Sequence, residues 1–190
     1  MNPQASKLFL LPVVLLLLIA CGNGSQPGIE ATAFMPSLDT SAVLKRSKAQ
    51  VTRIIDGDTF EVVLEDGSSD MVRLLGVDTP ETNGQNKPHE YGTITNTACL
   101  DKWGAQATSF AFNLLQSRSV TLQGDKVADE RGFYNRLLAY IKVGGQDFGS
   151  LLLAQGYARV YEEGESSKKQ EYRLLQSKAN MQRLGLWECG

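Results

Sequence analysis

Apolar and polar side chains alternate along residues 50–55, and the alternation stops at the Asp-Gly-Asp turn signal of residues 56–58. A period of two residues that ends at a turn predicts a β-strand. Residues 59–65 are rich in β-branched and aromatic side chains and run into the Asp-Gly hairpin signal of residues 66–67. Residues 71–77 form a third, largely apolar run. Strands joined by such short turns predict an antiparallel meander.

The remainder of the chain predicts further strands together with helices. A long loop comes first, over residues 81–97. Apolar side chains then recur at helical spacing in several segments, and short segments between them have the composition of strands. The predicted helices span residues 100–117, 148–155 and 168–184, and the predicted strands span residues 119–123 and 136–143. Many short antiparallel strands with packed helices predict an α+β domain, mainly β, built around a small barrel.

The N-terminal segment has the layout of a secretory signal. Lys7 supplies a positive charge, and residues 8–20 form an almost unbroken apolar run that Pro12 interrupts. The run is shorter than the about 20 apolar residues that a transmembrane helix needs. We therefore predict a signal peptide over residues 1–20, with an uncleaved anchor helix as the alternative.

The end of this run, Leu-Ile-Ala-Cys-Gly at residues 18–22, resembles a bacterial lipobox, in which the cysteine is acylated and becomes the first mature residue. The resemblance implies that Cys21 carries lipid and anchors an exported protein to the cell membrane or outer membrane, facing outside the cytoplasm. The alternative is an ordinary signal peptide with a coincidental cysteine. Residues 21–48 predict a flexible tether, and residues 49–190 predict one globular domain.

Cysteine usage agrees with export. The chain contains 3 cysteines, and if Cys21 carries lipid, Cys99 and Cys189 remain. A pair of thiols in an exported protein predicts a disulfide between them. A structural zinc site needs about four cysteine or histidine ligands, which this pair and the lone His89 do not provide.

Net charge does not identify a partner. The formal charge is -2 at pH 7, whereas many nucleic-acid binders are basic. A phosphate site can still be locally basic, so the positions of individual arginines are more informative than the sum. Because His89 is the only histidine and no G-x-S-x-G motif is present, His-dependent nucleases and serine hydrolases are disfavoured.

Acidic and basic side chains gather at the predicted strand ends. Asp58 follows the first strand, and Arg73 lies among the apolar residues of the third. Asp78 and Glu81 flank the end of that third strand. Carboxylate oxygens are the ligands that Ca²⁺ prefers, a carboxylate can activate water, and a guanidinium can hold phosphate. The residues therefore suit phosphodiester hydrolysis, and the alternative is a set of turn-forming acids with one ion-paired arginine.

Blocks of residues in this chain resemble a known family. Residues 55–59, residues 73–82 with the specific string Val-Asp-Thr-Pro-Glu-Thr, and residues 134–140 match the signature blocks of the staphylococcal nuclease family in order and spacing. The resemblance covers about residues 50–187. It implies a five-stranded OB-fold barrel with three packed helices, a fold suited to extended single strands. It also implies a Ca²⁺-dependent endonuclease that cuts DNA and RNA at the P–O5′ bond and leaves 3′-phosphate ends.

The resemblance also implies roles for individual residues. The implied calcium ligands, which offer carboxylates and a backbone carbonyl, are Asp58, Asp78 and Thr79. The implied catalytic residues, a general base and a pair of phosphate-binding guanidiniums, are Glu81, Arg73 and Arg136. The implied substrate contacts are Tyr134 in the nucleotide pocket and, in the region of base stacking, Tyr157 and Tyr161. We expect a monomer that binds single-stranded or melted DNA, and RNA.

The chain departs from the family pattern in the loop before the second arginine and in the loop after Glu81. Asn135 stands where a glycine is usual, and Asn is the residue next best suited to left-handed backbone. Because residues 128–133 also differ, Arg131 is a second candidate for the phosphate clamp. Residues 83–99 form an insertion that we expect to shape substrate access.

These patterns leave several functional hypotheses. The first is a membrane-tethered, Ca²⁺-dependent endonuclease. The second is a nucleic-acid-binding OB module that has lost catalysis, although such relatives lose the acidic residues that are present here. The third is a structural or adhesive lipoprotein in which Ca²⁺ only stabilises the fold.

Overall fold

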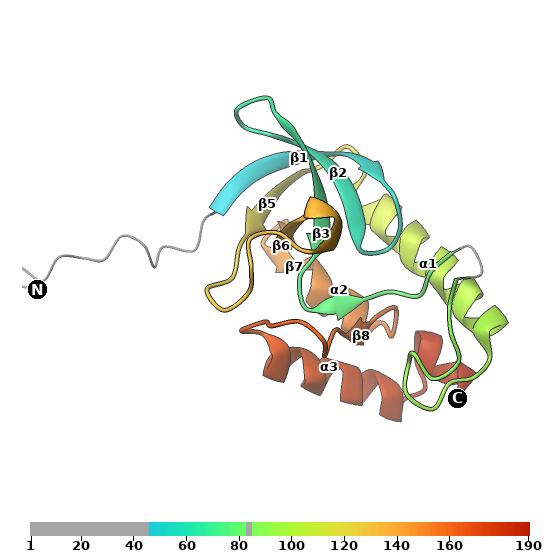
Figure 1. Ribbon diagram of the computed structural model, residues 1–190. Coiled ribbons are helices and arrows are strands. Elements are labelled where there is room, and N and C mark those ends of the chain that lie inside the picture. Colours follow the sequence, from blue (N-terminus) through green and yellow to red (C-terminus); the bar gives the residue numbers. More distant parts are fainter. Residues whose placement is uncertain (1–45, 83–84) are drawn as a thin grey trace, which may run out of the picture. The chain divides into compact units, whose positions relative to one another are not determined.

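The computed structural model describes residues 46–82 and 85–190 (Figure 1). The predicted signal peptide, the predicted lipid-bearing Cys21 and most of the predicted tether lie outside the described residues. The first strand begins at Arg46, ahead of the domain start that was predicted at residue 49. Within the described part of the chain, no helix has the length and apolar character needed to cross a membrane.

Five strands close into a barrel. β1 (Arg46–Ile54) pairs antiparallel with β2 (Thr59–Leu64), and β2 pairs antiparallel with β3 (Ser69–Leu74), so the predicted meander is confirmed. β5 (Ser119–Gln123) continues the sheet beyond β1, and β6 (Leu137–Val143) follows β5. β6 also pairs in parallel with β3, and this pairing closes the barrel. The predicted five-stranded OB-type barrel is therefore confirmed.

The hydrophobic interior of the barrel follows from the alternation of side chains along its strands. Successive side chains on a strand point to opposite faces of the sheet, so every second residue turns inward. The buried barrel residues at these alternate positions are Val51, Phe60, Val62, Val72, Leu74, Val120, Leu122, Ala139 and Ile141. Burial of each large apolar side chain contributes about 1.5 to 3 kcal/mol relative to exposure, so these positions hold the barrel in register.

A small second sheet lies beside the barrel and corrects the prediction of one continuous third strand over residues 71–77. β3 ends at Leu74, and the chain restarts as β4 (Val77–Asp78), which pairs antiparallel with β8 (Arg159–Val160). Between them, Gly76 has a φ of 79°, in the left-handed region that glycine tolerates and that a strand cannot continue through. The turn therefore moves Asp78 off the barrel and onto this second sheet.

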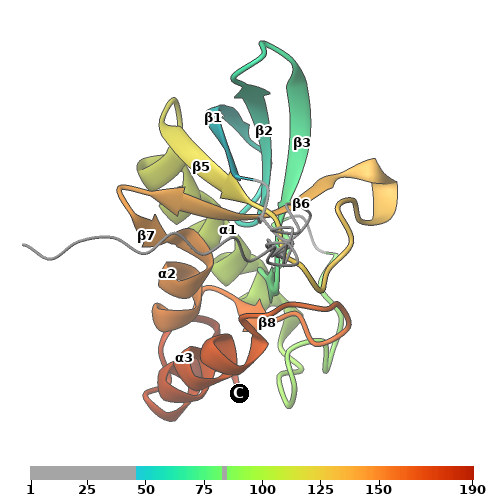
Figure 2. The same cartoon turned by 90° about the vertical axis from the view of Figure 1, so that its left-hand side faces the viewer.

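Three helices pack around the strands, as predicted. α1 (Thr97–Leu115) is capped by Asn96, whose side chain accepts a hydrogen bond from the backbone N–H of Cys99 at 3.0 Å. The helix buries one face, formed by Leu100, Gly104, Ala107, Ala111 and Leu115. α2 (Phe148–Ala154) follows β7 (Gln146–Asp147), and Figure 2 shows α2 between β7 and α3 (Lys169–Met181).

A second hydrophobic cluster, smaller than the barrel core, joins the insertion to the C-terminus. Its buried members are Tyr91, Ile94, Leu100, Ala179, Leu186 and Trp187. They come from the insertion, from α1 and α3, and from the short helix η3 (Gly185–Cys189). A disulfide joins Cys99 to Cys189 across a sequence separation of 90 residues, the same pair of cysteines that the sequence analysis joined. The insertion is therefore a packed and cross-linked part of the domain.

Candidate functional site

The ends of β3 and β4 and the start of β2 meet at one buried cluster of charges. The guanidinium of Arg73, on β3, lies between two carboxylates: its Nε is 3.2 Å from Oδ1 of Asp58, and its Nη2 donates to Oδ1 of Asp78 at 2.7 Å. Asp58 directly precedes β2 and Asp78 is the last residue of β4. The structure therefore brings together the three residues that the sequence placed at separate strand ends.

The remaining donors of Arg73 fix its position. Its Nη1 donates to the backbone carbonyl of Leu74 at 2.9 Å and to that of Val77 at 2.7 Å. Both carbonyls flank the turn that separates β3 from β4. The planar guanidinium is thus held in one orientation by backbone as well as by carboxylates, an arrangement that a lysine could not reproduce.

Asp58 is almost completely buried and ties the start of β2 to the segment after β4. Its Oδ2 accepts hydrogen bonds from the backbone N–H and the hydroxyl of Thr79, at 2.8 and 3.1 Å. Its Oδ1 also accepts a hydrogen bond from the hydroxyl of Thr59 at 3.1 Å. A Cβ on Gly57 would lie 2.8 Å from that of Ala107 on α1, so only glycine lets this turn approach the helix so closely.

Negative charge is in excess at this cluster. Burial, followed by repulsion from Asp58, raises the pKa of Asp56 to about 7 and that of Asp78 to about 6. The same two causes, in the same order, raise the pKa of Glu81. A raised carboxyl pKa means that the anionic form is destabilised, here first by the loss of water around the carboxyl and then by repulsion from Asp58. Additional positive charge would therefore stabilise the cluster.

The backbone around Glu81 is held rigidly while its side chain is exposed. Its N–H donates to Oδ1 of Asn86 at 2.9 Å, and Nδ2 of Asn86 returns a hydrogen bond to its carbonyl at 2.8 Å. The same Nδ2 also donates to Asp101 on α1 at 2.6 Å. A Cβ on Gly104 would lie only 2.4 Å from the carbonyl oxygen of Pro80, so α1 packs directly on this backbone. The Glu81 side chain is therefore exposed to solvent on a backbone that is held in place.

Arg136 approaches the cluster from the other side of Thr59. Its Nη1 donates to the hydroxyl of Thr59 at 3.4 Å, and its Cζ lies 5.7 Å from the centre of the Tyr134 ring. The preceding loop contains the short helix η2 (Phe133–Asn135), in which Tyr134 and Asn135 have φ values of 62° and 59°. The expectation that Asn135 adopts left-handed backbone is confirmed, and the turn brings Arg136 toward the buried acids.

The predicted tyrosines separate into two environments. Tyr161 is 38% exposed, and the Cζ atom of Arg73 lies 5.8 Å from its ring centre. Tyr134 is 81% exposed beside Arg136. Tyr157, by contrast, packs against Trp103 and Phe110 of α1, with ring centres 5.8 and 5.1 Å away. The structure therefore brings Tyr134 and Tyr161 to the site and places Tyr157 in the packing against α1.

Arg131, the second candidate for the clamp, is engaged elsewhere. It forms a two-pronged ion pair with Asp70, at 3.1 and 2.6 Å, and donates to the carbonyl of Asn135 at 2.7 Å. These contacts use its guanidinium to brace the loop before Arg136. Arg136, which contacts Thr59, is therefore the better placed of the two arginines.

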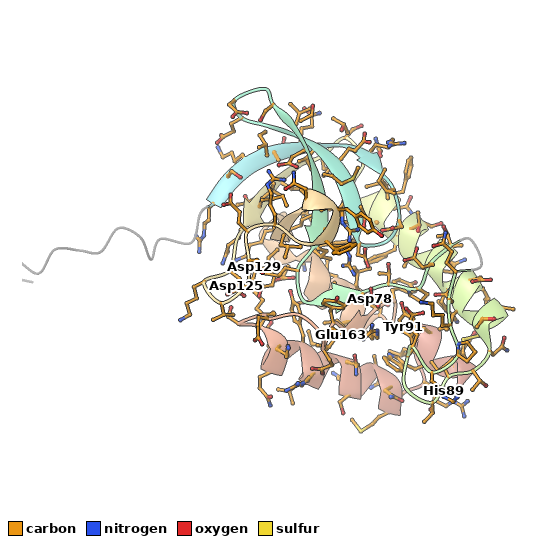
Figure 3. The ribbon with its side chains drawn as sticks, viewed as in Figure 1. Asp78, His89, Tyr91, Asp125, Asp129 and Glu163 are labelled. Atoms are coloured by element: carbon orange, nitrogen blue, oxygen red, sulfur yellow. A yellow bond between two sulfur atoms is a disulfide. The ribbon has the colours of Figure 1, made fainter. Side chains whose placement is uncertain are left out.

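Sequence reasoning missed two residues that contact Asp78. Arg159 of β8 lies opposite Asp78 in the small sheet, and its Nε donates to Oδ2 of Asp78 at 3.0 Å. The hydroxyl of Tyr91, from the insertion, donates to the same oxygen at 3.4 Å. Figure 3 shows Asp78, Tyr91 and Glu163 grouped together, with His89 at the outer end of the insertion loop. A charged residue in a buried strand is a signal that could have drawn attention to Arg159, whereas nothing local marked Tyr91.

The donor set suits a hard divalent cation. Within the described residues, no group of three or more His, Cys, Asp and Glu side chains is arranged as a metal site. The set implied by the sequence is different, because it combines the carboxylates of Asp58 and Asp78 with the backbone carbonyl of Thr79. These are the oxygen ligands that Ca²⁺ takes, and a bound cation would reduce the repulsion from Asp58 that, after burial, raises the pKa values of Asp56 and Asp78.

Comparison with known proteins identifies relatives. The family model of staphylococcal nuclease homologues matches residues 71–189, a range that begins after Asp58. The chain is 39% identical over 147 residues to the uncharacterized protein MJ1439 of Methanocaldococcus jannaschii, covering 73% of this chain and 70% of that protein. It is 36% identical over 137 residues to endonuclease YncB of Bacillus subtilis, covering 71% and 59%. It is 32% identical over 157 residues to the thermonuclease of Staphylococcus intermedius, covering 80% and 83%.

Proposed function

Because the chain belongs to the family of staphylococcal nuclease homologues, we propose that it is a Ca²⁺-dependent nuclease that hydrolyses the P–O5′ bond of DNA and RNA and leaves 3′-phosphate ends. The observation that carries the proposal is the position of the Arg73 guanidinium between the carboxylates of Asp58 and Asp78. A guanidinium that could bind phosphate therefore lies beside two carboxylates that could bind a cation. A second guanidinium, that of Arg136, contacts the neighbouring Thr59.

Asp58, Asp78 and the carbonyl of Thr79 would hold the Ca²⁺ ion, which when bound supplies positive charge to a phosphate oxygen and to the attacking water. Hydrogen bonds within the protein already orient the two carboxylates. Asp58 is oriented by hydrogen bonds from Thr79 and Thr59, and Asp78 by those from Arg73 and Arg159. Ligands whose orientation is fixed in advance bind without the cost of ordering them.

Arg73 and Arg136 would bind the scissile phosphate and stabilise the charge that accumulates in the transition state. Within the described residues, Arg136 makes only long hydrogen bonds, at 3.4 Å, to Phe133 and Thr59, so its paired N–H donors can match phosphate oxygens. Arg73, by contrast, contributes chiefly its charge. Groups that stabilise developing charge are worth about 10² to 10³ in kcat when removed singly. The burial of Arg73 strengthens its contribution, because charges interact more strongly where water is excluded.

Glu81 would accept the proton of the attacking water. Its pKa is raised by the partial loss of water around its carboxyl and by the nearby Asp58 carboxylate, which makes it a stronger base than an ordinary glutamate. Its exposed side chain can be reached by water, and its backbone is locked by Asn86. Position and basicity therefore both suit a general base.

The nucleobases would contact the aromatic residues around the two arginines. Phe133 and Tyr134 are 79% and 81% exposed at the tip of the loop, and their ring centres lie 4.6 Å apart. Tyr161 flanks the opposite side, next to Arg73. Exposed rings beside guanidiniums suit stacking with unpaired bases, so the proposed substrate is single-stranded or melted nucleic acid.

A cleavage assay on the purified chain tests this proposal. Single-stranded DNA is incubated with the protein in Ca²⁺ and then in EDTA, and the product ends are identified. We expect cleavage only with Ca²⁺, 3′-phosphate ends, and a loss of about a hundredfold in kcat for Glu81→Gln. Binding without cleavage would instead favour an inactive nucleic-acid-binding module. A rise in melting temperature with Ca²⁺, with neither binding nor cleavage, would favour a structural lipoprotein.

The lipid anchor at Cys21 is a separate part of the proposal. It rests on the Leu-Ile-Ala-Cys-Gly string at residues 18–22, which lies outside the described residues. In bacterial cells, Cys21→Ser should move the protein from the membrane fraction to the soluble exported fraction. Mass spectrometry that finds an unmodified Cys21 in membrane-bound wild-type protein would reject the anchor.

A further inference from the structure

A buried tyrosine of the insertion between Glu81 and α1 contacts a residue of the proposed calcium site. Tyr91 is 2% exposed, and its ring belongs to the second hydrophobic cluster. Its hydroxyl projects out of this cluster and donates to Oδ2 of Asp78 at 3.4 Å. A side chain of the apolar cluster thus contacts the carboxylate that Arg73 holds from the other side.

Packing and a covalent bond fix the position of Tyr91. Its ring shares the cluster with Ile94, Leu186 and Trp187, all of which are buried. The disulfide between Cys99 and Cys189 joins the start of α1 to the C-terminal helix η3 at this same cluster. The ring therefore has little freedom to move away from Asp78.

Arg159 completes the arrangement around the same oxygen. Its Nε donates to Oδ2 of Asp78 at 3.0 Å, and its Cζ lies 5.4 Å from the centre of the Tyr91 ring. Its Nη1 and Nη2 are bound by Glu163 at 3.0 and 3.1 Å. Oδ2 of Asp78 thus contacts Tyr91 and Arg159, whereas Oδ1 contacts Arg73.

We propose that Tyr91 is a positioning residue for Asp78, which holds the carboxylate so that one chosen oxygen faces the calcium site. The inference rests on the proposed function, because it assigns Asp78 to the ion. The carboxylate of an aspartate turns easily about its terminal torsion, which has only broad preferences. A fixed hydroxyl on Oδ2 restricts that rotation, so the ligand is oriented before the ion arrives. The insertion thereby supports ion binding without touching the substrate.

The test compares Tyr91→Phe with a matched control, Tyr172→Phe. Both replacements keep a buried ring and remove a hydroxyl that donates to a carboxylate, since Tyr172 is fully buried and donates to Oδ1 of Asp147 at 3.0 Å. Affinity for Ca²⁺ alone is measured by calorimetry, melting temperature is measured in EDTA, and cleavage is measured as a function of Ca²⁺ concentration. The loss of one hydrogen bond to a charged group predicts a Ca²⁺ affinity about five- to tenfold weaker in Tyr91→Phe.

We expect kcat of Tyr91→Phe at saturating Ca²⁺ to stay within about twofold of the wild type, because the hydroxyl acts on the ligand and not on the reacting atoms. Tyr172→Phe should bind Ca²⁺ with wild-type affinity. Equal Ca²⁺ affinity in wild type and Tyr91→Phe overturns this inference alone, as does an equal weakening in Tyr172→Phe. A wild-type protein that binds no Ca²⁺ overturns the proposed function together with it.

Discussion

Two buried tyrosines in this protein make the same kind of contact in different surroundings. The hydroxyl of Tyr91 donates to Asp78, and the hydroxyl of Tyr172 donates to Asp147. Basic side chains bind each carboxylate as well, Arg73 and Arg159 in the first case and Lys168 in the second. The two aspartates accept the same hydrogen bond from a tyrosine but differ in the charged groups around them.

Around Asp147, both carboxylate oxygens are paired with donors from neighbouring elements. Asp147 caps α2 by accepting from the backbone N–H of Ser150 at 3.1 Å. Lys168, at the start of α3, lies 4.3 Å from the centre of the Tyr140 ring and contacts Asp147. The negative charge here is balanced by one ammonium and by hydrogen-bond donors from neighbouring elements. This region joins α2 to α3 and contributes to stability.

Around Asp78, carboxylates outnumber the guanidiniums that bind them in the described part of the chain. Asp58, Asp56 and Glu81 add carboxylates to the same cluster, and burial together with Asp58 raises the pKa of Asp78 to about 6. Surplus charge of one sign in a buried place lowers stability and is characteristic of binding and catalytic sites. The two carboxylates therefore differ in the charges around them, and not in the hydrogen bond that each accepts from a buried tyrosine.

The largest expected effect is a loss of stability when the disulfide beside Tyr91 is removed. Replacing both Cys99 and Cys189 by Ser removes a cross-link between residues 90 positions apart in the sequence. In the chain-entropy model this lowers the free energy of unfolding by about 4 to 5 kcal/mol. Urea unfolding in EDTA measures the loss, and Ca²⁺ titration of the folded variant should show weakened binding as well. A stability loss below about 1 kcal/mol would contradict a tightly clamped cluster.

The next largest expected effect is a loss of stability when the Asp147 carboxylate is removed. Asp147→Ala removes the cap of α2 and the partners of Lys168 and Tyr172. Leaving a partly buried lysine without its carboxylate should lower the free energy of unfolding by about 3 kcal/mol. Below the melting temperature, kcat and Ca²⁺ affinity should match the wild type. A variant that folds normally but loses Ca²⁺ affinity would show that the two regions are coupled.

The third effect is a loss of activity when Arg73, which contacts Asp58 and Asp78, is replaced. Arg73→Lys keeps the charge but loses the planar fork that contacts Asp58, Asp78 and two backbone carbonyls. We expect kcat to fall by about a hundredfold or more, which corresponds to about 2.7 kcal/mol of transition-state stabilisation. Steady-state kinetics at saturating Ca²⁺ measure the change. Activity within about threefold of wild type would remove Arg73 from the proposed mechanism.

The smallest effect concerns a pair near the surface. A hydrogen bond from Arg131 lowers the pKa of Asp70, so the pair contributes stability above the unfolded-state pKa of about 3.9 and loses it as the pH falls through the lower folded value. Asp70→Asn should lower the melting temperature by about 1 to 2 °C at pH 7. The difference from wild type should disappear in strong acid. A difference that grows on acidification would contradict the assigned direction.

Local pattern predicted the main strands and helices and the acidic residues of the candidate site, whereas Thr79, Arg136 and the tyrosines were implied by the family resemblance. Alternation along residues 50–55 and the Asp-Gly turns predicted the meander, because side-chain direction on a strand depends only on the residues next to each other. The acids at positions 58 and 78 could be singled out because they stand at strand ends. The left-handed conformation of Asn135 was likewise a local property that residue type predicts.

Contacts between distant segments were decided by the tertiary structure alone. The parallel pairing of β3 with β6 closes the barrel, and the β4–β8 sheet brings Arg159 to Asp78. The packing of α1 draws Tyr157 into an aromatic group with Trp103 and Phe110. Each contact joins residues far apart in sequence, so no short pattern records it.

The sequence by itself therefore determined which residues could carry the chemistry, namely the acids at strand ends and Arg73 among apolar neighbours, with Arg136 implied by the family resemblance. The tertiary structure decided which of them share one place and which residues support them, including the insertion-borne Tyr91. The physical reason is that propensity and side-chain alternation act over a few residues, whereas burial and charge depend on every element packed around a group.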